Sequence, residues 1–125
     1  MSEATIIVSK EAPLPMAPYS QAVKTPTAIY LCGQIPVTAD GNFVQGSIAE
    51  KTKQCLANLQ AVLIEAGSSI QKVVKVTVFL TDMAYFDEMN GEYEKWFKNK
   101  PARSCVAVKA LPMGADVEIE AIALP

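Results

Sequence analysis

The segment Val73–Leu80 constrains the fold more than any other part of the chain. It reads Val-Val-Lys-Val-Thr-Val-Phe-Leu, and this run of β-branched residues predicts a strand. Alternation along the strand is expected to place four apolar side chains on one face: Val74, Val76, Val78 and Leu80. The other face is expected to carry Val73, Lys75, Thr77 and Phe79. Both faces are largely apolar, so we expect a strand that is buried on both sides.

The remaining pattern predicts further strands and two helices. Strands are predicted at residues 6–8, 21–25, 28–32, 43–44, 104–110 and 116–123. A helix is predicted at 47–66, because Ser47 and Glu50 fit a capping box and Gly67 follows its end. A second helix is predicted at 82–98, with a stripe that indicates core packing rather than a cofactor platform: Phe86, Met89, Tyr93, Trp96 and Phe97. Two helices cover only one face of such a sheet, so a homo-oligomer that packs sheet against sheet is the economical way to cover the other.

The composition excludes several classes of function. The 125 residues suit a single domain, residues 1–125, and half of them are apolar. Histidine is absent, which excludes Ser-His-Asp and Cys-His catalysis and His-ligated zinc. The net charge of -2 offers no basic field for nucleic acid or an acidic membrane. Cys32, Cys55 and Cys105 lie far apart in the sequence, which indicates reduced thiols. No targeting segment is recognisable, so we expect a cytoplasmic protein, with the nucleus as a second location.

A few polar residues are candidates for chemistry. Arg103 is the only arginine beside ten lysines, and its planar fork suits a carboxylate, although a salt bridge is an equal alternative. Glu118 and Glu120 share one strand face, where they either divide acid and base roles or line a solvated edge. Gly33 either lets a ligand approach the backbone or forms a turn. Cys105 has no histidine to activate it as a nucleophile.

Six short motifs stand along the chain. They are Pro18-Tyr19-Ser20-Gln21-Ala22, Cys32-Gly33-Gln34-Ile35-Pro36, Asn90 with Tyr93 and Phe97, Pro101-Ala102-Arg103-Ser104-Cys105-Val106, Leu111-Pro112, and Val117-Glu118-Ile119-Glu120-Ala121. Together they resemble the RidA (YjgF) family, the reactive intermediate deaminases, over almost the whole chain. The arginine, cysteine and glutamate have the spacing of the deaminating subgroup. The chain looks like a eukaryotic, cytosolic-type member.

The resemblance implies both a fold and an activity. The fold is α+β and chorismate-mutase-like: a six-stranded mixed sheet with two helices on one face, three copies of which pack sheet-inward into a barrel. The activity is that of a 2-iminobutanoate/2-iminopropanoate deaminase. Such enzymes hydrolyse enamines and imines of the 2-aminoacrylate class, released by pyridoxal-phosphate-dependent dehydratases, to 2-keto acids and ammonia. The resemblance implies no cofactor and no metal.

The resemblance also implies roles for individual residues. Arg103 would bind the substrate carboxylate, and Glu118 would position and activate the attacking water. The backbone amides of Gly33 and Cys105 would assist Arg103. The remaining residues implied to line the intersubunit cleft are Tyr19 and Asn90.

One position departs from the family, and two other functions stay open. Bacterial members often carry serine at the position of Cys32, and a thiol is a weaker hydrogen-bond partner than a hydroxyl. The first alternative is a regulatory trimer that binds small carboxylates without catalysis. The second is a translation-inhibiting ribonuclease, which the acidic charge and the absence of histidine disfavour.

Overall fold

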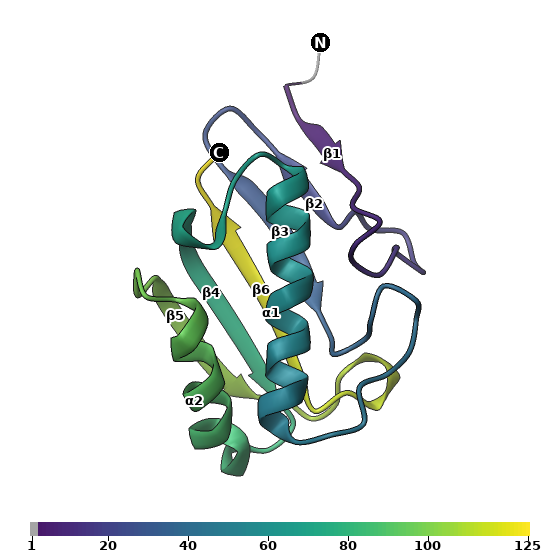
Figure 1. Ribbon diagram of the computed structural model, residues 1–125, viewed down its shortest axis with the longest axis vertical. Helices are drawn as coiled ribbons and strands as arrows, with labels where there is room; N and C mark the ends of the chain where they lie inside the picture. The colour runs from purple at the N-terminus through teal and green to yellow at the C-terminus, as the bar shows by residue number, and fades with distance from the viewer. Residues whose placement is uncertain (1–2) are drawn as a thin grey trace.

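A computed structural model describes residues 3–125, which form one mixed sheet (Figure 1). Its six strands are β1 (Thr5–Ile7), β2 (Ala22–Lys24), β3 (Ile29–Gln34), β4 (Val73–Leu80), β5 (Ala102–Ala107) and β6 (Val117–Ala123). Across the sheet they follow the order β1-β2-β3-β6-β4-β5. Only β4 and β5 pair in parallel, because the helix α2 carries the chain back between them.

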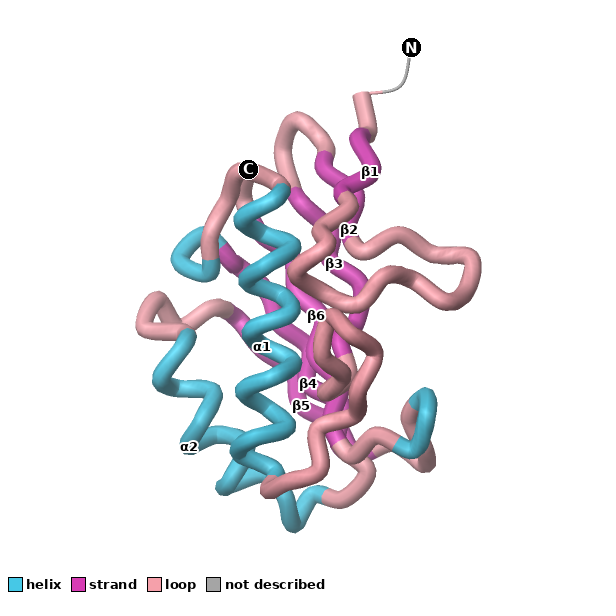
Figure 2. Tube along the Cα trace, turned by 45° about the vertical axis from the view of Figure 1, so that its right-hand side comes forward, coloured by secondary structure: helices cyan, strands magenta, loops and turns pink. Residues whose placement is uncertain are grey.

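Two helices, α1 (Ile48–Glu65) and α2 (Phe86–Trp96), lie on the same side of the sheet (Figures 1 and 2). The core fills the space between this helical layer and the strands. It includes the following fully buried side chains: Leu56, Leu59, Leu63, Val76, Val78, Leu80, Met89, Val117 and Ile119. The six-stranded mixed sheet with two helices on one face confirms the predicted fold class.

The first helix follows the predicted capping pattern. The Ser47 hydroxyl accepts a hydrogen bond from the Glu50 amide at 3.1 Å, and the Glu50 carboxylate accepts one from the Ser47 amide at 3.2 Å. At the other end, Gly67 has a φ of 79°, a conformation that suits glycine. Both predicted limits of α1 are therefore confirmed to within one residue.

Several predicted elements are shorter or displaced. The second helix begins with a separate 3-10 turn, Met83–Tyr85, because the Asp82 carboxylate caps the Ala84 amide at 2.8 Å. It ends at Trp96, before Lys100 takes a positive φ of 51°. Residues 43–44 form only an isolated bridge, Val37 to Phe43, rather than a strand. The strand predicted at 104–110 runs instead from Ala102 to Ala107.

A bulge in β4 makes the predicted assignment of its two faces wrong at one end. Val73 pairs with Ala123 and Lys75 pairs with Ile122, so Val74 is the extra residue of the bulge. Val73 is therefore buried against the helices, while Val74 is 43% exposed. Beyond the bulge the alternation is as predicted.

The face of the sheet opposite the helices stays open in a single chain. It carries the apolar side chains Ile6, Val23, Tyr30, Phe79, Val106 and Ile122. Tyr30 is 51% exposed and Val106 is 43% exposed, so burial on both sides is not reached within residues 3–125. In the same residues, no helix combines the length and hydropathy that crossing a membrane requires.

Candidate functional site

A second bulge, in β3, shapes the first half of the candidate site. Leu31 pairs with Ala121 and Gln34 with Ile119, so Cys32 and Gly33 together face a single residue of β6. Bulges of this kind bend a strand and redirect its side chains, and they are frequent beside active sites. The strand predicted at 28–32 is therefore longer than expected and includes Gly33 and Gln34.

The bulge brings Gly33 directly under the side chain of Glu118. A Cβ atom at position 33 would lie 2.8 Å from the Glu118 Cδ and would collide with one of its carboxylate oxygens. Any larger side chain at position 33 would force the Glu118 carboxylate to move away. Glu118 is half-buried there, and burial, together with the nearby charge of Glu120, raises the pKa of its carboxyl.

A cavity of about 650 Å³ opens in front of Glu118. Its wall is mainly apolar and includes Leu14, Met16, Tyr19, Ile35, Val37 and Met113. Cys32 and Gly33 also line it, so the structure brings Tyr19, Gly33 and Glu118 together. Burial and the charge of Glu118 raise the pKa of the Cys32 thiol to about 11, despite a hydrogen bond from Gln34 that lowers it, so this thiol is neutral near pH 7.

Gln21 holds the N-terminal wall of this cavity in place. Its amide nitrogen donates to the carbonyls of Ser9 at 3.0 Å and Pro13 at 2.8 Å, and its oxygen accepts from the Ser9 amide at 2.6 Å. Gln21 is only 1% exposed, so these bonds satisfy a buried amide. Sequence reasoning assigned it no role, because a single glutamine carries no signal of burial.

Arg103 forms the second half of the candidate site, beside α2. Its Nη1 donates to the Asn90 side-chain oxygen at 2.8 Å. The guanidinium carbon lies 4.7 Å from the centre of the Tyr93 ring and 5.6 Å from that of Phe86, within the range of cation–π attraction. Asn90 was expected to line the cleft; the contact that the structure shows is with Arg103.

The helix explains why three side chains meet Arg103. Phe86, Asn90 and Tyr93 are spaced four and three residues apart, so they share one face of α2. Sequence reasoning treated Phe86 and Tyr93 as a core stripe, and both do pack against the core. Both residues also contact Arg103, which lies on β5. This contact depends on the parallel pairing of β5 with β4, so the sequence of the helix alone could not predict it.

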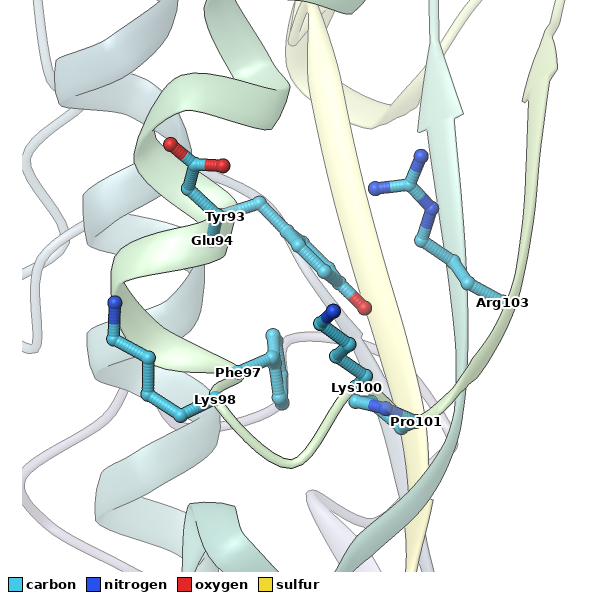
Figure 3. A pocket seen from close by; sticks show the side chains of 7 residues that line it. All are labelled: Tyr93, Glu94, Phe97, Lys98, Lys100, Pro101 and Arg103. Carbon is cyan, nitrogen blue, oxygen red and sulfur yellow. The ribbon is translucent and has the colours of Figure 1, made fainter.

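A cleft of about 520 Å³ lies next to Arg103 (Figure 3). It is lined by Tyr93, Glu94, Phe97, Lys98, Lys100, Pro101 and Arg103. Three cationic side chains against one carboxylate favour an anionic ligand. Cys105 lies two residues further along β5 and packs partly against the core, and burial raises the pKa of its thiol while Arg103 lowers it.

The two halves lie on opposite faces of the sheet in one chain. Arg103 pairs with Val76, whose side chain is buried under the helices. Glu118 pairs with Phe79 on the open face. The structure therefore does not bring Arg103, Asn90 and Cys105 together with Tyr19, Gly33 and Glu118 inside a single subunit.

Residues 9–125 match the family described as Endoribonuclease L-PSP. The chain belongs to this family. It is 51% identical over 120 residues to Protein HMF1 of Saccharomyces cerevisiae, covering 95% of this chain and 93% of that protein. It is 49% identical over 121 residues to the mitochondrial Protein MMF1 of the same yeast, covering 96% and 83%. Because MMF1 is mitochondrial, the cytoplasmic location of this chain stays a prediction.

Solved structures confirm the fold of this L-PSP family member. The Rid family protein YyfA of Yersinia pestis is 43% identical, with a TM-score of 0.94, and the match covers 98% of this chain and 99% of that one. TdcF of Escherichia coli, solved with bound serine, is 34% identical, with a TM-score of 0.92 and coverage of 97% and 98%. Among residues 3–125, no group of three or more histidine, cysteine or acidic residues could hold a metal ion.

The contact between Gly33 and Glu118 leads to a prediction about stability. Gly33→Ala should displace the Glu118 carboxylate and lower the melting temperature modestly, because that carboxylate is the far end of a flexible side chain and moving it into another rotamer costs about 0.5–1.5 kcal/mol. Adding Glu118→Ala should restore most of the loss. Gly91→Ala is the matched control: its Cβ meets open space in a helix, so it should stabilise the protein by about 0.5–1 kcal/mol. Equal melting temperatures for Gly33→Ala and wild type, measured by calorimetry, would contradict the contact.

Proposed function

We propose that this protein is a hydrolytic deaminase of enamine and imine intermediates of the 2-aminoacrylate class, of the 2-iminobutanoate/2-iminopropanoate type. The observation that carries the proposal is the environment of Glu118. Its carboxylate is half-buried beside a cavity, has a raised pKa, and makes no ion pair within residues 3–125. A carboxylate of this kind is suited to take a proton from water at neutral pH.

The reaction requires only two functions of the protein, binding of the substrate carboxylate and activation of water. Arg103 holds the substrate carboxylate, while Glu118 takes a proton from a water molecule whose oxygen adds to the imine carbon. As the water oxygen adds, the carbon–nitrogen double bond becomes single and Glu118 passes the proton to nitrogen, which gives a carbinolamine. Glu118 then takes the proton of the carbinolamine hydroxyl and delivers it to nitrogen, the carbon–nitrogen bond breaks, and ammonia leaves the 2-keto acid. Proximity of carboxylate and water supplies several kcal/mol, and a general base adds roughly 10²–10⁴-fold.

The arrangement of Arg103 supports its proposed role. Asn90 occupies one guanidinium nitrogen, and the rings of Tyr93 and Phe86 flank the group, so it is held in place before a ligand arrives. Its other N–H groups remain available for a two-pronged contact with a carboxylate. The bound serine in TdcF, an amino acid with such a carboxylate, supports a ligand of this class in this family.

We further propose that the working unit is a homotrimer of the eukaryotic, cytosolic type, with each site shared between two subunits. Glu118 and Arg103 face opposite sides of one sheet, and a site that uses both therefore needs a second copy. The open apolar face, with Tyr30, Phe79 and Val106, offers the surface on which copies would pack. The substrate would come from a pyridoxal-phosphate-dependent dehydratase.

The description of the family, Endoribonuclease L-PSP, favours a second candidate function, an endoribonuclease. The cationic lining of the cleft at Lys98, Lys100 and Arg103 is compatible with a phosphate. The absence of histidine removes the usual acid–base group of strand cleavage, and the net charge of -2 opposes phosphate binding. RNA cleavage that survives repurification and disappears in an Arg103 variant would favour this candidate over the deaminase.

The role of Glu118 is tested by Glu118→Gln. Keto-acid release coupled to a dehydratase should fall by about 10²–10⁴-fold, with ligand binding retained, while Glu120→Gln should change the rate much less. Wild-type activity should also decline on the acidic side as Glu118 becomes protonated. Equal rates for wild type and Glu118→Gln would assign the activation of water to another group.

The same variant has a predicted effect on stability. Because the pKa of Glu118 is higher in the folded protein, the folded state binds this proton more tightly, and ionisation of Glu118 lowers stability as pH rises through that window. Glu118→Gln should therefore melt at a higher temperature than wild type at pH 7, and the difference should vanish in acid.

Arg103→Lys tests the two-pronged contact. Lysine keeps the charge but lacks the fork, so catalytic efficiency should fall nearly as far as in Arg103→Ala, by roughly 30- to 1,000-fold. Melting temperature and subunit association, measured in parallel, control for misfolding. Near-normal deamination by a well-folded Arg103→Lys would show that a simple charge suffices.

A further inference from the structure

Within residues 3–125, the buried hydroxyl of Tyr93 has no hydrogen-bond partner. The residue is 8% exposed, and its hydroxyl oxygen is shielded from solvent. Arg103 lies near enough for its charge and a polar contact to lower the pKa of this hydroxyl, against the effect of burial, which raises it. That contact does not have the distance and angle of a hydrogen bond, and no other group within residues 3–125 makes one to the oxygen. A buried hydroxyl without a partner destabilises a fold, so native proteins seldom retain one without a reason.

The position of this hydroxyl suggests the reason. Tyr93 reaches from α2 across the cleft of about 520 Å³ toward β5, where Arg103 stands (Figure 3). Its ring is fixed on both sides, by the Arg103 guanidinium at 4.7 Å and by the Phe97 ring at 4.6 Å. The hydroxyl is therefore held in one place beside the only arginine of the chain.

The surroundings supply donors and almost no acceptors. Lys98, Lys100 and Arg103 line the cleft, with Glu94 as its only acidic residue. Lys100 is exposed, so its side chain is free to move aside when a ligand enters. A ligand that brought two acceptor oxygens to Arg103 would give the Tyr93 hydroxyl the partner it lacks.

We propose that Tyr93 is a further substrate-binding residue, whose hydroxyl donates a hydrogen bond to the carboxylate that Arg103 holds. The inference rests on the proposed function, because it takes a 2-imino or 2-oxo acid as the ligand of this cleft. It adds a donor that the sequence motifs did not assign, and it explains why tyrosine rather than phenylalanine completes the stack with Phe97.

The test compares two variants that each remove an unpartnered buried hydroxyl. Tyr93→Phe removes the one in the cleft, and Thr52→Val removes the Thr52 hydroxyl in α1, which lines neither cavity. Binding of pyruvate, a stable 2-oxo acid, is measured by calorimetry on the full chain, with melting temperature alongside. Tyr93→Phe should weaken pyruvate binding roughly tenfold, as expected for a hydrogen bond to a charged group, while Thr52→Val should bind normally.

Stability separates this role from a structural one. Neither variant should melt below wild type, because each loses a hydroxyl that had no partner. Unchanged pyruvate affinity in Tyr93→Phe, a parallel loss of affinity and melting temperature, or no pyruvate binding by wild type would each overturn the inference. Failure of wild type to deaminate imines, with the binding difference intact, would refute the proposed function alone.

Discussion

Strict alternation along β6 divides the chemistry of this protein between two faces of its sheet. β6 lies between β3 and β4, and its residues Val117, Ile119, Ala121 and Ala123 are all buried under the helices. Glu118 and Glu120 must then point to the open face, since a shift of one residue would bury two carboxylates and expose the core. The bulge in β3 then places Gly33 beneath the Glu118 carboxylate on that face.

The two halves are prepared in different ways. Glu118 is held partly out of water by its contact with Gly33, which favours the protonated form and so makes the carboxylate a better base. Arg103 is held by a hydrogen bond and two aromatic rings, which fix its direction. In the proposed reaction these preparations correspond to activating water and gripping a carboxylate, and no histidine is needed for either.

Local signals predicted much of the fold correctly. The capping box at Ser47 and the β-branched run Val73–Leu80 depend on neighbouring residues alone, so α1 and β4 were found nearly to the residue. The bulges at Val74 and at Cys32 and Gly33 depend on pairing with β6, and no local pattern reveals them. For this reason the faces at the start of β4 were assigned wrongly.

The candidate site shows the same division between local and long-range information. The motifs named Arg103, Asn90 and Glu118, but their mutual geometry depends on strand order. Asn90 holds Arg103 through a hydrogen bond. The register of β4 with its neighbours β5 and β6 shows that Arg103 and Glu118 face opposite sides of the sheet. Tyr93 was assigned to the core, correctly, and its place beside the arginine emerged only with the parallel strand β5.

Mixing two inactive subunits tests most directly whether each site is shared between two chains. Glu118→Gln and Arg103→Ala proteins are unfolded together in equal amounts, refolded, and assayed for imine deamination. In a closed ring, some sites then combine an intact Arg103 from one chain with an intact Glu118 from the next, and activity should return to about a quarter of wild type. No recovery in correctly assembled mixed oligomers would contradict the shared site and with it the account given for the two faces of the sheet.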